Sequence, residues 1–137
     1  MTCIFCDIIS GEKNGHFIYE DETHVAFLDK YPIDQGHSLV LPREHFERVT
    51  DMNPEKVGAL FSKTPKIARG ILKATQADAF SMAQNNGWAA KQIVPHVHVH
   101  IIPRYNHKGT IWTKRNITND AELNLLASKI RKNIESS

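Results

Sequence analysis

The sequence predicts an α+β fold: an antiparallel sheet of about five strands with a long central helix and a C-terminal helix. Three observations support this prediction. Short runs of apolar and β-branched residues alternate with turn residues in the N-terminal part of the chain. Helical periodicity follows, over residues 54–72 and again near the C-terminus. Residues 96–102 alternate with the period of a strand. Because the turns between the early strands are short, antiparallel pairing is expected.

The early strands are bounded by recognisable turn signals. Residues 17–19 and 24–28 are rich in apolar, β-branched and aromatic residues and form two predicted strands, joined by a turn at 20–23. Residues 29–36 contain proline and glycine and predict a loop. A third strand is expected over 37–41, stopped by Pro42.

The second half of the chain predicts two helical regions separated by two strands. Asn53 is a candidate N-cap before a proline, and Pro65 should kink or break the helical pattern of residues 54–72. Residues 79–83 form a possible strand, with a turn at 85–87. Pro103 ends the strand of residues 96–102. Asn119 and Glu122 have the spacing of a capping arrangement for the final helix.

Length, composition and charge exclude several classes of protein. A chain of 137 residues with 41% hydrophobic and 23% charged residues is expected to fold as one globular domain, residues 1–137. A net charge of +2 argues against a nucleic-acid-binding protein. No apolar run approaches the roughly 18 residues of a membrane span, and the first residues lack a secretory signal, so a cytoplasmic location is expected.

A row of histidines is the strongest functional signal. On a strand, His96, His98 and His100 point to one face, and the apolar residues between them point to the core. An ordinary solvated face would mix Lys, Glu, Thr and Ser. A neutral imidazole can attack phosphorus and form a phosphohistidine. Three imidazoles can also hold a catalytic zinc ion. The spacing alone does not separate these two interpretations.

The cysteine pair is a second signal. Cys3 and Cys6 have C-x-x-C spacing, which indicates half of a zinc site or a redox pair, and a reducing compartment disfavours a disulfide between them. A redox pair would follow a strand, and no strand precedes residue 3. Two reduced, partly buried thiols are the remaining interpretation.

The motif His-Val-His-Val-His-Ile-Ile at 96–102 resembles the signature of the histidine triad (HIT) family. The resemblance extends to residues 3–12, to Ala26-Phe27-Leu28-Asp29 and to 36–42 with His45. It therefore covers a core of residues 3–105, with a C-terminal extension of 106–137, and it is strongest toward the Hint-like bacterial branch. That branch hydrolyses nucleoside phosphoramidates and related nucleotides.

The resemblance implies a role for each matching residue. His98 would be the nucleophile, with His100 and His37 beside the scissile phosphate. Asp29 would accept the ribose hydroxyls, which suits a carboxylate with two oxygens. The residues that would line the base slot or contact the ribose and phosphate are Ile4, Phe5, Ile8, Phe27, Leu39, Asn85 and Gln92. Without the resemblance, Ile8, Phe27 and Leu39 are typical core residues.

The resemblance also implies a structural zinc ion, held by Cys3, Cys6, His45 and His96, no organic cofactor, and a homodimer. The expected function is hydrolysis at the α-phosphate of purine nucleotides through a nucleotidyl-histidine intermediate. The expected partners exclude nucleic acid and membrane. One departure stands in the loop before the triad, where Lys91-Gln92-Ile93 replaces Gly-Gln-Ser. Isoleucine cannot donate the hydrogen bond of that serine.

Three alternatives accompany this expectation. A dinucleoside polyphosphate hydrolase is compatible with residues 98–104. A purine-nucleotide binding module with little turnover is favoured by the loss of the loop serine. A three-histidine zinc hydrolase would lose activity with a chelator. The uridylyltransferase branch of the family is disfavoured, because it carries glutamine where His100 stands.

Overall fold

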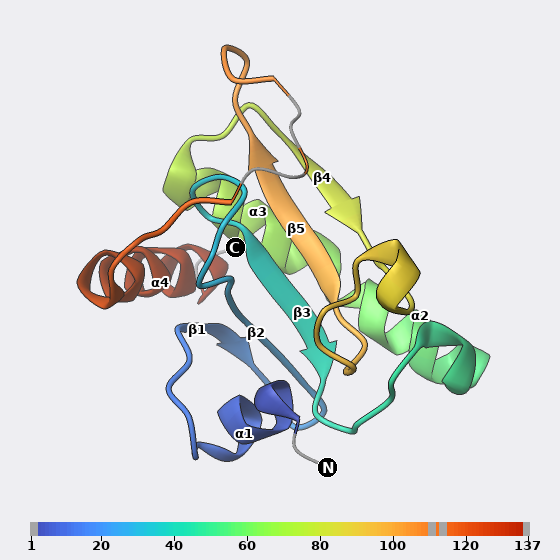
Figure 1. Ribbon diagram of the computed structural model, residues 1–137. Coiled ribbons are helices and arrows are strands. Elements are labelled where there is room, and N and C mark those ends of the chain that lie inside the picture. Colours follow the sequence, from blue (N-terminus) through green and yellow to red (C-terminus); the bar gives the residue numbers. More distant parts are fainter. Residues whose placement is uncertain (1–2, 110–111, 113–114, 136–137) are drawn as a thin grey trace.

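The computed structural model describes residues 3–109, 112 and 115–135. Its strands form one antiparallel sheet in the order β1-β2-β3-β5-β4, which confirms the predicted α+β class (Figure 1). The strands are β1 (Phe17–Glu20), β2 (His24–Leu28), β3 (Ser38–Pro42), β4 (Ala79–Ala83) and β5 (Val99–Arg104). The helices are α1 (Ile4–Ser10), α2 (Pro54–Ser62), α3 (Thr64–Thr75) and α4 (Asp120–Glu135), with short 3-10 helices η1 (Val49–Asp51) and η2 (Trp88–Ala90).

The two faces of the sheet pack against different helices. One face contributes Ala26, Val40 and Val99 to the main core, which it shares with α3 and α4. Figure 1 shows α3 behind the sheet and α1 near the start of β2. The opposite face contributes Phe27 and Leu39 to a second cluster with residues of α1. This division follows from the alternation of side chains along each strand.

Helix α4 is part of the main core, although it lies beyond the segment of strong family resemblance. Its buried side chains are Leu123, Ala127, Ile130 and Ile134. It approaches α3 closely at Gly70, where an added Cβ would lie 3.1 Å from the backbone nitrogen of Ile134. The extension predicted for 106–137 therefore contains structural residues of the same domain.

The helical pattern of residues 54–72 is divided into two helices, as Pro65 predicts. Asn53 caps α2, since its side chain accepts a hydrogen bond from the Lys56 N–H at 2.9 Å. Pro65 lies in the first turn of α3, where its missing N–H has no helical partner to lose. Asn119 likewise accepts from the Glu122 N–H at 2.8 Å, in agreement with the predicted cap of the last helix.

An unpredicted helix and the bounds of β3 and β5 are the main differences from the sequence prediction. Helix α1 was not predicted; the Cys3 thiol caps its start and Gly11, with φ of 89°, follows its end. Strand β3 begins at Ser38 and includes Pro42. Strand β5 begins at Val99 rather than His96 and continues through Pro103. Pro103 is tolerated because β5 pairs with β3 only up to Ile101, so no ladder bond to β3 is lost there.

Among the described residues, no helix combines the length and the apolar composition that crossing a bilayer requires.

Candidate functional site

The predicted histidine row lies on one side of the sheet, at the start of β5. Val97, Val99 and Ile101 enter the main core, as the alternation predicts. His98 and His100 lie on the opposite face, with ring centres 4.9 Å apart. His96 is also on this side but contacts the ring of His45 rather than the other two histidines of the row. The row is therefore divided between two clusters.

His37 joins His100 across the sheet, and their hydrogen bonds fix their tautomers. The backbone N–H of Ile33 donates to Nδ1 of His37 at 2.9 Å, so a neutral His37 carries its proton on Nε2. That Nε2 lies 2.9 Å from Nδ1 of His100 and donates to it. His100 consequently carries its proton on Nε2. Gly36 lets the chain enter this position with φ of 92°, close to α3.

His98 has the opposite tautomer from His37 and His100. Its Nδ1 lies 2.6 Å from the carbonyl oxygen of His96 and must donate to it, because a carbonyl only accepts. In the neutral ring Nε2 is then the unprotonated nitrogen. The ring is also held edge-on against Phe5, with ring centres 5.0 Å apart. Among these three histidines, His98 alone has a lone pair that its protein hydrogen bonds do not use.

Burial keeps these imidazoles neutral. Burial lowers the pKa of His37 to about 3, and the positive charges of Arg115 and Arg104 act in the same direction. Burial lowers the pKa of His100 to about 3 as well. The pKa of His98 is lowered by burial, against the opposing effect of its hydrogen bond to the His96 carbonyl. Neutral rings at neutral pH suit a nucleophile.

The same hydrogen bonds argue against a metal ion among the triad residues. Ligand atoms of Asp29, His37 and His100 lie within 4.8 Å of one another. However, a neutral His37 spends its lone pair on the Ile33 N–H, and a neutral His100 spends its own on His37. A metal ligand must offer a free lone pair. The arrangement therefore suits proton positioning better than metal binding.

Asp29 follows β2 and lies beside His37, but its carboxylate already has partners. Oδ1 accepts the Tyr31 N–H at 2.9 Å, and Oδ2 accepts Nη1 of Arg115 at 2.9 Å. Oδ2 is also 3.6 Å from Nε2 of His37. A carboxylate offers about four acceptor positions. Asp29 can therefore accept further hydrogen bonds on the open side.

Most of the predicted base-slot residues lie together. Phe5, Phe27 and Leu39 are buried in the second cluster, and Ile8 packs against it. Phe5 meets Phe27 edge-to-face, with ring centres 5.4 Å apart. Ile4 is 44% exposed and is not one of the cluster's members. The cluster provides an apolar wall beside His98, whereas Ile4 lies at the surface.

Hydrogen bonds of the Gln92 side chain hold the loop before the triad in place. Gln92 is buried; its Oε1 accepts the Gly87 N–H at 2.6 Å and its Nε2 donates to the Glu47 carbonyl at 2.6 Å. Asn85 is half-buried beside this loop and accepts a bond at its carbonyl from Gln84. These bonds give Gln92 a structural task in addition to its predicted contact with nucleotide.

The two departures in this loop have clear structural forms. Lys91 has φ of 69°, so it adopts the left-handed backbone that glycine adopts at little cost. Ile93 is 64% exposed. The loop thus keeps a conformation suited to the glycine of the family pattern, but it presents the apolar side chain of Ile93 where that pattern has the hydroxyl donor of serine.

A cluster of two cysteines and two histidines lies at the start of α1. Cys3 Sγ is 3.5 Å from Nδ1 of His96, and Cys6 Sγ is 3.5 Å from the same nitrogen and 3.4 Å from Nδ1 of His45. Tetrahedral zinc, with bonds of about 2.3 Å to sulfur and about 2.0 Å to nitrogen, places such atoms about 3.5 Å apart. The four residues therefore fit a zinc ion.

The surroundings of this cluster also fit a metal. Nε2 of His96 donates to the carbonyl of Pro42 at 2.8 Å, which leaves Nδ1 unprotonated and directed at the sulfurs. Burial, followed by the neighbouring Cys3, raises the pKa of Cys6 to about 11. A redox C-x-x-C pair needs a lowered thiol pKa instead. Cys3 and Cys6 do lie at the start of a helix, but the raised pKa of Cys6 does not support redox chemistry.

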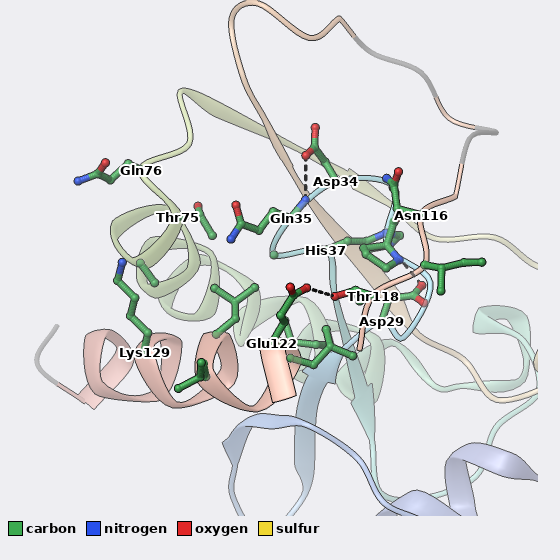
Figure 2. A pocket seen from close by; sticks show the side chains of 18 of the residues that line it. Asp29, Asp34, Gln35, His37, Thr75, Gln76, Asn116, Thr118, Glu122 and Lys129 are labelled. Carbon is green, nitrogen blue, oxygen red and sulfur yellow. Dashed lines mark hydrogen bonds and ion pairs between the residues drawn. The ribbon is translucent and has the colours of Figure 1, made fainter. Parts of the chain in front are cut away.

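A separate cavity of about 840 Å³ reaches Asp29 and His37 from the side of α3 and α4 (Figure 2). Its walls carry both signs of charge. Acidic Asp34 and Glu122 face basic Lys108 and Lys129. Figure 2 shows Asp29, Asn116 and Thr118 at one end and Lys129 at the other.

Two residues of the C-terminal segment that hold the site, Arg115 and Asn116, were not predicted from the sequence. Arg115 donates to Asp29 and also to the Tyr31 carbonyl at 2.7 Å. Asn116 donates its backbone N–H to the Pro32 carbonyl at 2.9 Å and its side chain to the Ile33 carbonyl at 3.0 Å. No local signal marks these polar residues, because their partners lie about eighty residues earlier in the chain.

Curated relatives cover nearly the whole chain. The adenylylsulfatase HINT3 of Arabidopsis thaliana is 37% identical over 137 residues, which cover 96% of this chain and 69% of the relative. The adenosine 5'-monophosphoramidase hnt1 of Schizosaccharomyces pombe is 33% identical over 138 residues, which cover 98% of this chain and 100% of the relative.

Solved structures have the same fold. A hypothetical histidine triad nucleotide-binding protein from Sulfolobus tokodaii has a TM-score of 0.90 at 36% identity, covering 98% of this chain and 93% of its own. A zinc-bound histidine triad family protein from Mycobacterium smegmatis has a TM-score of 0.86 at 34% identity, covering 99% and 95%. The family model described as the HIT domain matches residues 10–107. The chain belongs to the HIT domain family.

Proposed function

We propose that this protein hydrolyses purine nucleotides at the α-phosphate, with nucleoside phosphoramidates or similar compounds as substrates, through a nucleotidyl group carried on His98. The observation that supports this most directly is the tautomer of His98. Its Nδ1 is committed to the His96 carbonyl, so the neutral ring offers Nε2 as a nucleophile. The activities named for the two relatives, an adenylylsulfatase and an adenosine monophosphoramidase, accord with it.

The proposed reaction has two displacements at phosphorus. Nε2 of His98 forms a bond to the α-phosphorus, the bond from phosphorus to the leaving group breaks, and a leaving amine takes up a proton from solvent. The protonated Nε2 of His100, aligned by His37, donates a hydrogen bond to the phosphoryl oxygens or the leaving group. Water then attacks phosphorus and gives up a proton to solvent, the bond to His98 breaks to return the neutral ring, and a nucleoside monophosphate leaves.

The substrate would be held by the two features beside His98. The cluster of Phe5, Phe27 and Leu39 supplies an apolar surface for the base. Asp29 accepts hydrogen bonds from the ribose hydroxyls on its open side. Asn85 and Gln92 border the ribose and phosphate from the loop before the triad.

The test is turnover of an adenosine phosphoramidate by wild type and His98→Ala, each with and without a chelator. We expect the variant to lose turnover and the wild type to keep it in chelator. His107→Ala is the matched control, because His107 is an exposed histidine outside the site. Mass spectrometry of the wild type quenched and denatured at alkaline pH, where a phosphorus–nitrogen bond to histidine survives, should detect one adenylyl group. Full activity in His98→Ala would contradict the mechanism.

We propose a structural role for zinc at Cys3, Cys6, His45 and His96. A closed set of four ligands leaves no position for substrate. The ion would tie α1, which carries Phe5, to the start of the triad segment. We expect one zinc ion per chain by elemental analysis and a lower melting temperature after chelation. An unchanged melting temperature in a chain shown to have lost zinc would contradict this role.

We also propose a homodimer. Strand β4 pairs with β5 and, within the described part of the chain, has no strand on its other side. Phe80 and Met82 on this strand are 40% and 41% exposed. An unpaired strand edge with exposed apolar residues favours pairing with another chain. Light scattering should give twice the chain mass, and Phe80→Lys should shift it toward the monomer.

A nucleotide-binding module with little turnover is the second candidate. The observation in its favour is the exposed Ile93 at a position where the family pattern has a hydroxyl donor. Tight binding of AMP without turnover by the wild type would support it. Ile93→Ser should then restore turnover, because it returns the missing donor.

A further inference from the structure

We propose that Arg115 makes the ribose end of the site selective for nucleotides that carry a phosphate on the ribose 2' or 3' oxygen. This inference rests on the proposed function, since it takes Asp29 as the ribose contact. In such a nucleotide one ribose hydroxyl remains free to bond to Asp29, and the phosphate on the other oxygen meets Arg115.

The position of Arg115 is fixed by the fold, although its side chain is partly exposed. Nη1 donates to Oδ2 of Asp29 at 2.9 Å and to the carbonyl of Tyr31 at 2.7 Å. The next residue, Asn116, is bonded to the carbonyls of Pro32 and Ile33. Several hydrogen bonds therefore hold the segment of Arg115 along the 29–37 loop, and they keep the arginine beside the carboxylate of Asp29.

The charge of Arg115 changes what the carboxylate can recognise. Asp29 alone would accept hydrogen bonds from a diol and would repel a phosphate placed at the same point. With Arg115 bonded to it, the pair carries no net charge. In dinucleotide-binding folds an acidic residue binds the ribose 2'-hydroxyl, or a nearby arginine accommodates a 2'-phosphate.

Arg115 also retains suitable donors. Its own segment, residues 106–118, contains no acidic residue, and the bonds found among the described residues use only Nη1. Nε and Nη2 remain as two donors with the forked geometry that matches phosphate oxygens. The side chain is 42% exposed, so an entering ligand can reach it.

There is also room beside the carboxylate. Asp29 and Asn116, the bonded partner and the chain neighbour of Arg115, line the cavity of about 840 Å³ shown in Figure 2, whereas Arg115 itself is not a lining residue. The arginine therefore stands at the edge of this cavity, and a phosphate on the ribose would lie at that edge while the α-phosphate stays at His98. The positive charge of Arg115 is felt as far as His98 and His100, which accords with a position at the edge of the same site.

The test compares three ligands by calorimetry: AMP, adenosine 2',5'-bisphosphate and adenosine 3',5'-bisphosphate. For the wild type we expect one bisphosphate to bind at least as tightly as AMP. In Arg115→Ala the affinity for that bisphosphate relative to AMP should fall about 10- to 100-fold, the loss that one charged hydrogen-bonding group typically causes. Arg115→Lys should be intermediate, because it keeps the charge and loses the fork.

Arg69→Ala is the matched control. Arg69 is an exposed arginine of α3 that does not line the cavity, so its removal also deletes one positive charge without touching the site. Its ratio of affinities should match that of the wild type. A wild type that prefers AMP at least 10-fold over both bisphosphates, with an unchanged ratio in Arg115→Ala, would overturn the inference and leave Arg115 a structural latch.

The outcome is separable from that of the proposed hydrolysis. Absence of phosphoramidate turnover by the wild type, with AMP binding retained, would refute hydrolysis, and the affinity ratio would still decide the role of Arg115. Failure of all three nucleotides to bind would refute both proposals.

Discussion

Replacing Ile130 by alanine tests whether α4 belongs to the cooperative core of the domain. Ile130 is fully buried between α4 and the main core, and α4 is connected to the 115–118 segment that carries Arg115. If the extension were a separable addition, a cavity in α4 would leave the stability of the sheet unchanged. The structure instead predicts a loss for the whole domain.

The magnitude follows from the burial and from the contact between α3 and α4. Ile130→Ala removes three carbon atoms, which at about 0.8 kcal/mol each is a loss of about 2.5 kcal/mol. The two helices are already in contact at Gly70 and Ile134, so the site cannot collapse and a cavity adds about 1 kcal/mol. We expect the free energy of unfolding to fall by about 3.5 kcal/mol.

Denaturant and thermal unfolding at fixed zinc concentration measure this change. For a chain of 137 residues, the unfolding entropy of about 2.1 cal/mol/K per residue converts 3.5 kcal/mol to a melting temperature about 12 °C lower. Leu125→Ala is the control on the same helix; Leu125 is 75% exposed, and its loss should stay within about 0.5 kcal/mol. Equal effects of the two substitutions, or a change below about 1 kcal/mol for Ile130→Ala, would refute the reasoning.

Three further predictions follow from individual residues. First, the pKa values of about 3 for His37 and His100 mean that both rings stay neutral in the folded chain while the unfolded chain takes up protons below about pH 6.5. The free energy of unfolding therefore has its full value above that pH and decreases as pH falls below it, by up to about 2.7 kcal/mol per pH unit for the two rings together. Urea unfolding at pH 7, 6 and 5 measures this slope, and a flat profile would contradict it. Second, because burial lowers the pKa of His98 and the neutral ring is the proposed nucleophile, the acid limb of kcat/KM should lie below pH 6.5; a limb above pH 7 would argue against it. Third, Gln76 is the C-cap of α3 and has φ of 57°, a left-handed backbone that glycine adopts at little cost. Gln76→Gly should therefore stabilise the fold by about 0.5–1 kcal/mol, whereas Lys73→Gly within the helix should destabilise it by about 1 kcal/mol. Thermal unfolding of both variants provides the comparison.

The periodicity of the sequence was sufficient to predict the sheet and the face on which the histidines lie. In residues 96–102 the alternation of histidine with apolar residues assigns one side to the core, because successive side chains of an extended chain point in opposite directions. The caps at Asn53 and Asn119 are also local and were predicted correctly. Pro65 marked the division of the helical region, because its ring excludes a continuous helix.

The same local reasoning failed where long-range contacts decide the conformation. Helix α1 has only seven residues, too few to form without tertiary packing, and its cap is a cysteine thiol rather than a hydroxyl or carboxylate. The triad segment enters β5 only at Val99, because the backbone N–H of Val97 donates to the carbonyl of Phe46, which lies beyond the end of β3, instead of to a neighbouring strand. Neither feature has a signal in the adjacent sequence.

The sequence by itself determined the kind of chemistry available to this protein: a row of imidazoles on one face, a carboxylate after a strand, and two closely spaced thiols. The tertiary structure decided how these groups are used. It separated His96 from His98 by giving each a different carbonyl partner, and it brought Arg115 to Asp29 across 86 residues. The physical reason is that residue type fixes which protons and lone pairs exist, whereas the partners that engage them are set by strand register and chain packing.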